Sequence, residues 1–82
     1  MLVGRPEGAT RVVGKSQGYL GLPILDMEMV DPVSGNVVNV MTTSWIPTEK
    51  EIAAIVAGAP IHVHIFGMVH PPIYLDVGDI PE

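Results

Sequence analysis

The sequence predicts a small α+β domain, in which two hairpins form an antiparallel sheet and one short helix covers one face, in the order ββαββ. Three observations predict this fold. Apolar residues alternate with polar ones in two separate parts of the chain, turn-forming residues divide each part into two runs, and a helix-capping pattern lies between the parts. The 82 residues suffice for one domain, with a glycine-rich N-terminal segment (1–17), a core (18–78) and a tail (79–82).

The first predicted hairpin lies after the glycine-rich segment. Residues 25–30 alternate between apolar and mostly acidic side chains, which is typical of a strand with one buried face. Residues 31–36 (DPVSGN) combine aspartate, proline, glycine and asparagine, the residue types that turns require. Residues 37–43 are rich in β-branched side chains and predict the second strand. Residues 10–13 predict an additional short edge strand.

The helix is predicted from the boundary signal at residues 45–51 (WIPTEKE). Thr48 is a favourable N-cap residue, and Glu51 lies three positions later, where a capping box requires a glutamate. Apolar residues then recur at helical spacing up to Val56, and Gly58 is a typical helix terminator. A helix this short needs tertiary packing to persist.

The second predicted hairpin follows the helix. Residues 61–66 alternate between isoleucine or valine and histidine or phenylalanine, and residues 73–77 alternate again. Glycine and two prolines interrupt the pattern in residues 67–72, which therefore predict the connecting loop.

Composition and charge exclude several classes of protein. A chain that is 48% hydrophobic and 16% charged is not a disordered tail. A net charge of −5 argues against binding a long nucleic acid, whose backbone needs clustered cations. The absence of cysteine excludes disulfides and thiolate metal sites. Without a signal peptide or an apolar run of about 18 residues, we expect a soluble, cytoplasmic protein that does not associate with membranes.

The apolar share is high for a domain of this size. Small folds usually compensate for a limited core with disulfides, metals or partners, and this sequence supplies no cysteine and few metal ligands. We therefore expect copies of the chain to bury part of their apolar surface against one another in a homo-oligomer.

The histidines are the first candidates for chemistry. His62 and His64 lie two positions apart on a predicted strand, so both should point to the same face. With His70 or Asp76 they are candidate ligands for Zn²⁺ or a similar ion, which would allow a metal-dependent enzyme. The alternatives are a pair that faces a bound ligand and the polar face of an ordinary strand. Because no third ligand lies at a fixed offset, we predict no metal site and no cofactor. At a subunit interface, the pair should make assembly respond to pH near 6.

Other residues also allow two interpretations. The carboxylates Asp26 and Glu28 share a strand face and would allow acid–base chemistry in a buried cleft, but their alternation with apolar residues favours solvent exposure. Tyr19 is either a stacking surface for a planar ligand or a plug for the end of the sheet. Trp45 is either a core anchor or an interface anchor. No phosphate-binding loop, dinucleotide fingerprint or nucleophile elbow is present, so we predict no enzymatic activity.

An ordered set of short motifs resembles small proteins encoded by bacteriophages and prophage-bearing bacteria. The resemblance covers residues 18–77 and implies a phage or prophage origin, and thus action in the host cytoplasm. It implies no catalytic residues. The motifs are Gly18-Tyr19, Gly21-Leu22-Pro23, Trp45, Pro47-Thr48, Gly58, Pro60-Ile61, Gly67 and His70-Pro71-Pro72.

The function expected from these observations is non-enzymatic binding. By analogy with compact phage proteins that evade host immunity by sequestering nucleotide second messengers, we expect a nucleotide-type ligand at the subunit interfaces. The alternative is a protein–protein interaction module, either an inhibitor of a host protein or a virion accessory protein. The candidate ligand-binding residues are cations for phosphate, aromatic rings for a base and imidazoles for hydrogen bonds: Arg5, Arg11, Lys15, Tyr19, Trp45, His62, His64 and His70.

Overall fold

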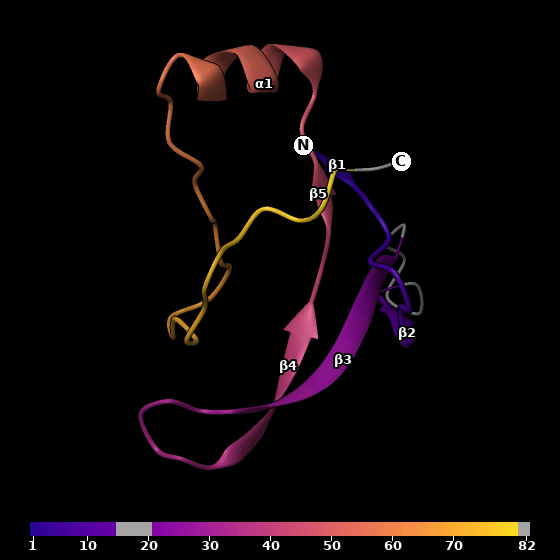
Figure 1. Cartoon of the computed structure of the whole chain (residues 1–82), viewed down its shortest axis with the longest axis vertical. Coiled ribbons are helices and arrows are strands. Elements are labelled where there is room, and N and C mark those ends of the chain that lie inside the picture. The colour runs from indigo at the N-terminus through magenta and orange to yellow at the C-terminus, as the bar shows by residue number, and fades with distance from the viewer. Residues whose placement is uncertain (15–20, 81–82) are drawn as a thin grey trace.

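The computed structural model describes residues 1–14 and 21–80 (Figure 1). The described residues form two antiparallel sheets and one short helix, which confirms the predicted α+β class. No helix within these two ranges has the length and hydrophobicity needed to cross a bilayer. The elements in chain order are β1 (Leu2–Val3), β2 (Arg11–Val13), β3 (Leu22–Val30), β4 (Val37–Thr42), β5 (Trp45–Ile46) and α1 (Glu49–Val56).

The larger sheet has the strand order β2-β3-β4, with β3 at its centre. β3 and β4 form the first predicted hairpin, in register from Leu25 opposite Thr42 to Val30 opposite Val37. β3 begins at Leu22, earlier than predicted, because its first residues pair with β2 instead of β4.

The turn between β3 and β4 closes through the residue types that predicted it. The Asp31 N–H donates to the Asn36 carbonyl at 2.8 Å, and the Asp31 carboxylate accepts from the Val33 N–H at 2.8 Å. Gly35 has a φ of +75°, a conformation that side chains with a Cβ rarely adopt. Aspartate and glycine therefore specify this turn locally.

The two faces of the larger sheet differ in chemistry. Residues opposite one another in the ladder share a face, so Asp26 lies beside Met41 and Glu28 beside Asn39, with Arg11 of β2 on the same side. Side chains on the opposite side of the β3–β4 hairpin are apolar except for one threonine. We call that side the apolar face and define it by Leu25, Met27, Met29, Val38 and Val40.

A second, two-stranded sheet joins the N-terminus to the segment before the helix. β1 pairs with β5, with Val3 opposite Trp45, and the Gly4 N–H donates to the Ser44 carbonyl at 2.8 Å. A Cβ atom on Gly4 would lie 3.2 Å from the Ile46 side chain, so glycine permits this close approach. The sequence did not predict this pairing, because two-residue strands carry no alternation signal.

The helix begins at the predicted cap. The Thr48 hydroxyl accepts from the Glu51 N–H at 3.3 Å, and the Glu51 carboxylate accepts from the Thr48 N–H at 2.9 Å, which confirms the capping box. The hydrogen bond from the Thr48 N–H, followed by that from the Met1 ammonium group, lowers the pKa of Glu51 to about 2. Gly58, with a φ of +97°, follows the helix as predicted.

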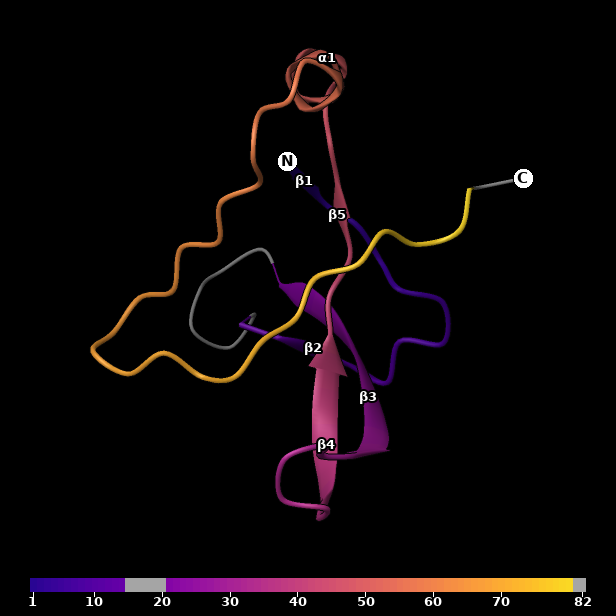
Figure 2. The same ribbon diagram turned by 60° about the vertical axis from the view of Figure 1, so that its left-hand side comes forward.

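The position of the helix differs from the prediction. No residue of α1 is buried, and the helix lies beyond β5 instead of covering a face of the larger sheet (Figures 1 and 2). Its capping is specified by neighbouring residues, whereas its docking on the sheet depends on long-range contacts that local sequence does not specify. The apolar side chains of Ile52 and Ile55 consequently remain exposed.

Residues 60–80, which we call the C-terminal arm, contain neither helix nor strand. The strands predicted at 61–66 and 73–77 are therefore not formed within one chain. Among the described residues, no backbone group of the arm hydrogen-bonds to another backbone group. The arm runs from α1 along one side of the molecule and returns towards β1 and β5 (Figures 1 and 2). A segment with alternating apolar residues forms a strand only where it can pair with the edge of another strand. In the described part of its own chain, the arm pairs with no strand edge.

Very little apolar surface is buried. Within residues 1–14 and 21–80, Ile24 is the one buried large hydrophobic residue, with 5% of its surface exposed. The Cα radius of gyration is 14.7 Å, whereas a compact domain of this length has a radius of about 12 Å. The chain is thus expanded relative to an ordinary domain.

Replacing Thr48 by alanine tests the capping box. Thr48→Ala removes the hydroxyl that accepts from the Glu51 N–H and should destabilise the helix by about 1 kcal/mol. We expect a weaker helical signal in far-ultraviolet circular dichroism. Lys50→Ala, inside the helix but outside the capping box, is the control and should retain the signal. Equal helical signals in both variants would contradict the assigned cap.

Candidate functional site

Three of the predicted ligand-binding residues lie on or next to the strands β1, β2 and β5. Arg5 is exposed and follows β1, Arg11 lies on β2, and Trp45 lies on β5. Lys15 and Tyr19 lie outside the described residues, so their roles in phosphate binding and stacking stay predictions.

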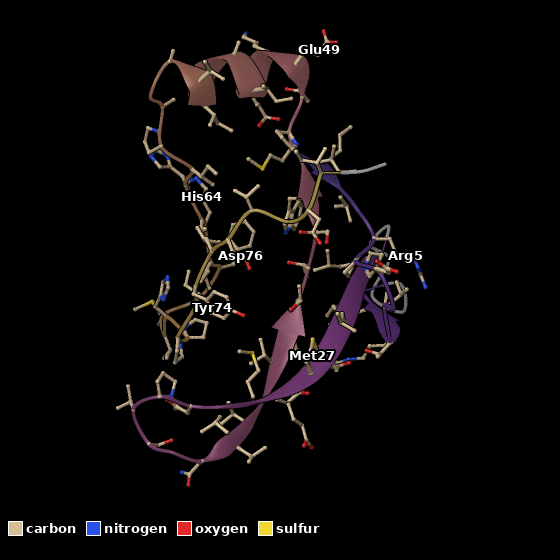
Figure 3. All side chains as sticks on the ribbon, viewed as in Figure 1. Arg5, Met27, Glu49, His64, Tyr74 and Asp76 are labelled. Atoms are coloured by element: carbon tan, nitrogen blue, oxygen red, sulfur yellow. The ribbon has the colours of Figure 1, made fainter. Side chains whose placement is uncertain are left out.

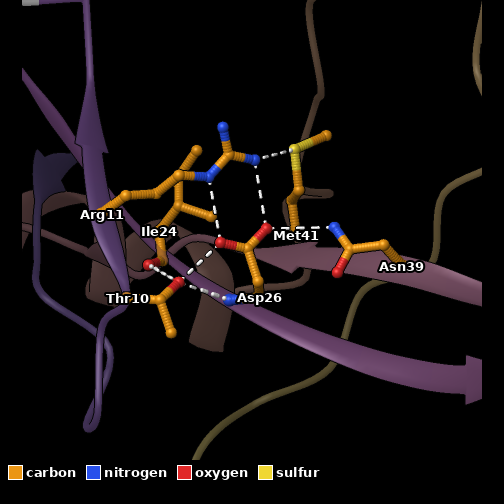
Figure 4. A network of polar contacts seen from close by, with 6 residues as sticks. All are labelled: Thr10, Arg11, Ile24, Asp26, Asn39 and Met41. Atoms are coloured by element: carbon orange, nitrogen blue, oxygen red, sulfur yellow. Dashed lines mark hydrogen bonds and ion pairs between the residues drawn. The ribbon is translucent and has the colours of Figure 1, made fainter.

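Arg11 and Asp26 form the centre of a polar network on the larger sheet (Figure 4). The Arg11 Nε atom donates to one carboxylate oxygen at 2.9 Å, and its Nη2 atom donates to the other at 3.1 Å. The Thr10 hydroxyl donates to the same carboxylate at 2.6 Å, and the Asn39 amide donates to it at 3.0 Å. Asp26 therefore connects β3 to both neighbouring strands through side chains.

This network determines the charge state of Asp26. The hydrogen bond from Arg11 holds the pKa of Asp26 well below its usual range, and hydrogen bonds from Thr10 and Asn39 act in the same direction. The hydrogen bond to Asp26 in turn raises the pKa of Arg11. An ionised carboxylate that accepts from these donors is poorly suited to proton transfer near neutral pH. The geometry therefore favours a structural role for Asp26 over acid–base chemistry with Glu28.

The ion pair between Arg11 and Asp26 also affects how readily Arg11 could bind a phosphate. A phosphate bound by Arg11 would have to compete with the Asp26 carboxylate, which accepts two hydrogen bonds from Arg11. Arg5 is exposed and, among the described residues, forms no ion pair. Arg5 is therefore the better placed of the two arginines to bind an anion.

Trp45 lies at the surface and does not anchor a core. Its indole N–H donates to the Thr43 hydroxyl at 3.0 Å, and 48% of the residue surface is exposed. Of the two interpretations of Trp45, the geometry favours the interface anchor. Its ring is also accessible for stacking on a planar ligand.

The histidines all lie on the C-terminal arm. The rings of His62 and His64 have centroids 6.1 Å apart and meet edge to face, so the two imidazoles lie near one another. The Nδ1 atom of His70 lies 2.8 Å from the carbonyl oxygen of Pro71, within the loop itself. In the part of the chain that the structure describes, no three histidine or carboxylate side chains gather in a geometry that could hold a metal ion. The three-histidine arrangement is therefore not assembled within one chain.

The cation and the imidazoles lie apart in the chain. Arg5 and His64 are on opposite sides of the molecule, with β5 between them (Figure 3). Compared with known protein families, curated proteins and solved structures, the chain matches none.

The sequence analysis did not predict the polar network around Asp26. It treated Asp26 as a solvent-facing carboxylate and Arg11 as a phosphate ligand, without connecting them. The connection depends on the register of β2, which places Arg11 opposite Ile24 and one pleat away from Asp26. The register between β2 and β3, which are separated by residues 14–21 of the sequence, is not encoded in local alternation.

The Asp26 network predicts a specific dependence of stability on pH. Because the folded state lowers the pKa of Asp26, its contribution to stability is present above the unfolded pKa of about 4 and decreases as the pH falls below it. Asp26→Asn should therefore lower the melting temperature at pH 7, and its difference from the unsubstituted protein should narrow at acidic pH. Thermal unfolding followed by circular dichroism across this pH range measures both effects.

Glu28→Gln is the matched control for this prediction. Glu28 lies on the same face of β3 but makes no side-chain hydrogen bond to another described residue. Its substitution should leave the melting temperature at neutral pH almost unchanged. Equal losses in the Glu28 and Asp26 variants would show that the network does not stabilise the sheet.

Proposed function

We propose that this chain is a non-enzymatic binding protein of phage type, whose homo-oligomer holds a nucleotide second messenger at subunit boundaries. By sequestering the messenger in the host cytoplasm, the protein would evade host immunity. One observation carries the proposal: the candidate binding groups that the structure describes are exposed, on separate parts of a chain whose described residues include one buried large hydrophobic residue. Binding groups that lie on separate exposed surfaces of one chain favour a ligand site that forms only when several chains assemble.

The chemistry of the exposed groups supports a nucleotide. A nucleotide requires a cation for phosphate, a planar surface for the base and polar groups for the sugar or base edges. Arg5 supplies the first and the exposed ring of Trp45 supplies the second. His62 and His64 supply neighbouring imidazole nitrogens. The net charge of −5 favours one or two phosphates over a polymer.

The phage assignment is supported by the sequence alone. The ordered motifs between residues 18 and 77 resemble those of small phage and prophage proteins. Immune evasion is inferred from the size and style of such proteins, so it rests on analogy and depends on a ligand being found.

A protein–protein interaction module is the second candidate function. Exposed methionines favour it, because their flexible side chains adapt to varied partner surfaces. Met68 is fully exposed on the arm, and Met27 and Met29 are exposed on the apolar face. In this alternative, a host protein or a virion component would cover these residues.

Calorimetric titration distinguishes the two candidates. The purified protein should release or absorb heat with at least one member of a panel of cyclic dinucleotides, linear dinucleotides and ADP-ribose derivatives, without turnover. Arg5→Ala should weaken that binding about tenfold or more, because a charge-assisted hydrogen bond contributes about 1.5–3 kcal/mol. Arg11→Ala is less informative, since it also breaks the Asp26 network.

Lys50→Ala provides a matched control for the loss of one positive charge. Lys50 is exposed on α1, away from the candidate groups, so its removal should leave nucleotide binding nearly unchanged. Absence of heat with the whole panel would contradict the nucleotide proposal. Capture of one identified host protein, unaffected by Arg5→Ala, would then favour the interaction module.

A further inference from the structure

The apolar face of the larger sheet is only partly covered by its own chain. Met27 is 52% exposed and Met29 is 41% exposed, although an antiparallel sheet with one polar and one apolar side normally buries the apolar side. The helix does not lie on it. One contact from the arm reaches it, where the Tyr74 hydroxyl lies 3.7 Å from the Met29 sulfur.

The C-terminal arm has the sequence pattern of β-strands but pairs with no sheet in the described part of its own chain. Its apolar residues alternate in 61–66 and again in 73–77. Its backbone makes no backbone hydrogen bond to the other residues that the structure describes. Unpaired backbone groups beside alternating apolar side chains are typical of a segment that adds to a sheet in another molecule.

The exposed area indicates how much surface a partner has to cover. The chain exposes 7456 Å², whereas a compact monomer of this mass exposes about 4,700 Å². The excess is therefore about 2,700 Å² per chain. Obligate homodimers bury about 2,000–5,000 Å² in total, or roughly half of that per chain. For two chains the excess amounts to about 5,400 Å², which lies at the upper end of what large obligate interfaces bury.

A second copy of the chain is the partner that these surfaces fit. Each chain carries both a partly exposed apolar face and an unpaired arm, so mutual exchange leaves neither surface unpartnered and closes the assembly. We propose that the arm of one copy lies across the apolar face of a second copy, where the predicted strands at 61–66 and 73–77 form and pair with each other as a hairpin. This inference rests on the homo-oligomer of the proposed function but not on its ligand.

Site-directed crosslinking tests the exchange, because the chain contains no cysteine of its own. Met27→Cys and Leu75→Cys are introduced into separate full-length chains that carry tags of different size. The two chains are refolded together and treated with a short bismaleimide. We expect a covalent heterodimer that joins the apolar face of one copy to the arm of the other.

Glu28→Cys is the matched control, because Glu28 neighbours Met27 on β3 but points to the polar face. It should give several-fold less heterodimer with Leu75→Cys. Equal crosslinking from both faces would overturn the inference. A doubly substituted chain, Met27→Cys with Leu75→Cys, that crosslinks only within itself would also overturn it, since the arm would then cover its own sheet.

Hydrogen exchange on the unsubstituted protein provides a second test that requires no variant. Amides in 61–66 and 73–77 should be protected if they pair in the assembly, and unprotected amides there would overturn the exchange. An oligomer that binds nucleotide but has a free arm would overturn only this inference. Protected, crosslinked arms in a protein that binds no nucleotide would overturn only the ligand assigned under the proposed function.

Discussion

Apolar surface in contact with water is the constraint on which the rest of this structure depends. The hydrophobic effect favours burial in proportion to area, and it is the largest favourable term in folding a domain of this size. Here Ile24 alone provides a buried large side chain among the described residues, while isoleucine, valine, methionine and aromatic side chains lie exposed along the sheet, helix and arm. We propose that a chain with this distribution gains its stabilising burial through association.

Local interactions explain which parts of the chain are nevertheless ordered by hydrogen bonds. The β3–β4 hairpin is closed by its own turn, and α1 begins at its own cap. Each of these features satisfies polar groups and needs no large core. The arm has no such local device, so its backbone groups stay without backbone partners in the described part of one chain. The segments that make local hydrogen bonds are therefore ordered, whereas apolar side chains that need long-range contacts for burial remain exposed.

The same distinction explains how much could be predicted from the sequence. Residues 31–36 and the pair Thr48 and Glu51 predicted a turn and a helix start correctly, because neighbours within a few positions decide these features. The β1–β5 pairing and the Arg11–Asp26 ion pair join segments that meet only after folding. Local alternation carries no information about such pairings. The strands predicted in the arm have the right pattern but find no edge within one chain. The candidate ligand groups were identified by residue type, whereas their separation in space was visible only in the structure.

The exposed apolar surface offers an explanation for why Arg5 lies apart from His62 and His64. We propose that these groups share a ligand only between chains, because an assembly that covers the apolar faces would also bring parts of different chains together. Assembly is therefore the central claim, and binding depends on it. Sedimentation velocity at micromolar concentration tests it most directly. The account predicts a single species with a mass that is a multiple of 8.7 kDa, and a homogeneous species of one chain would contradict it.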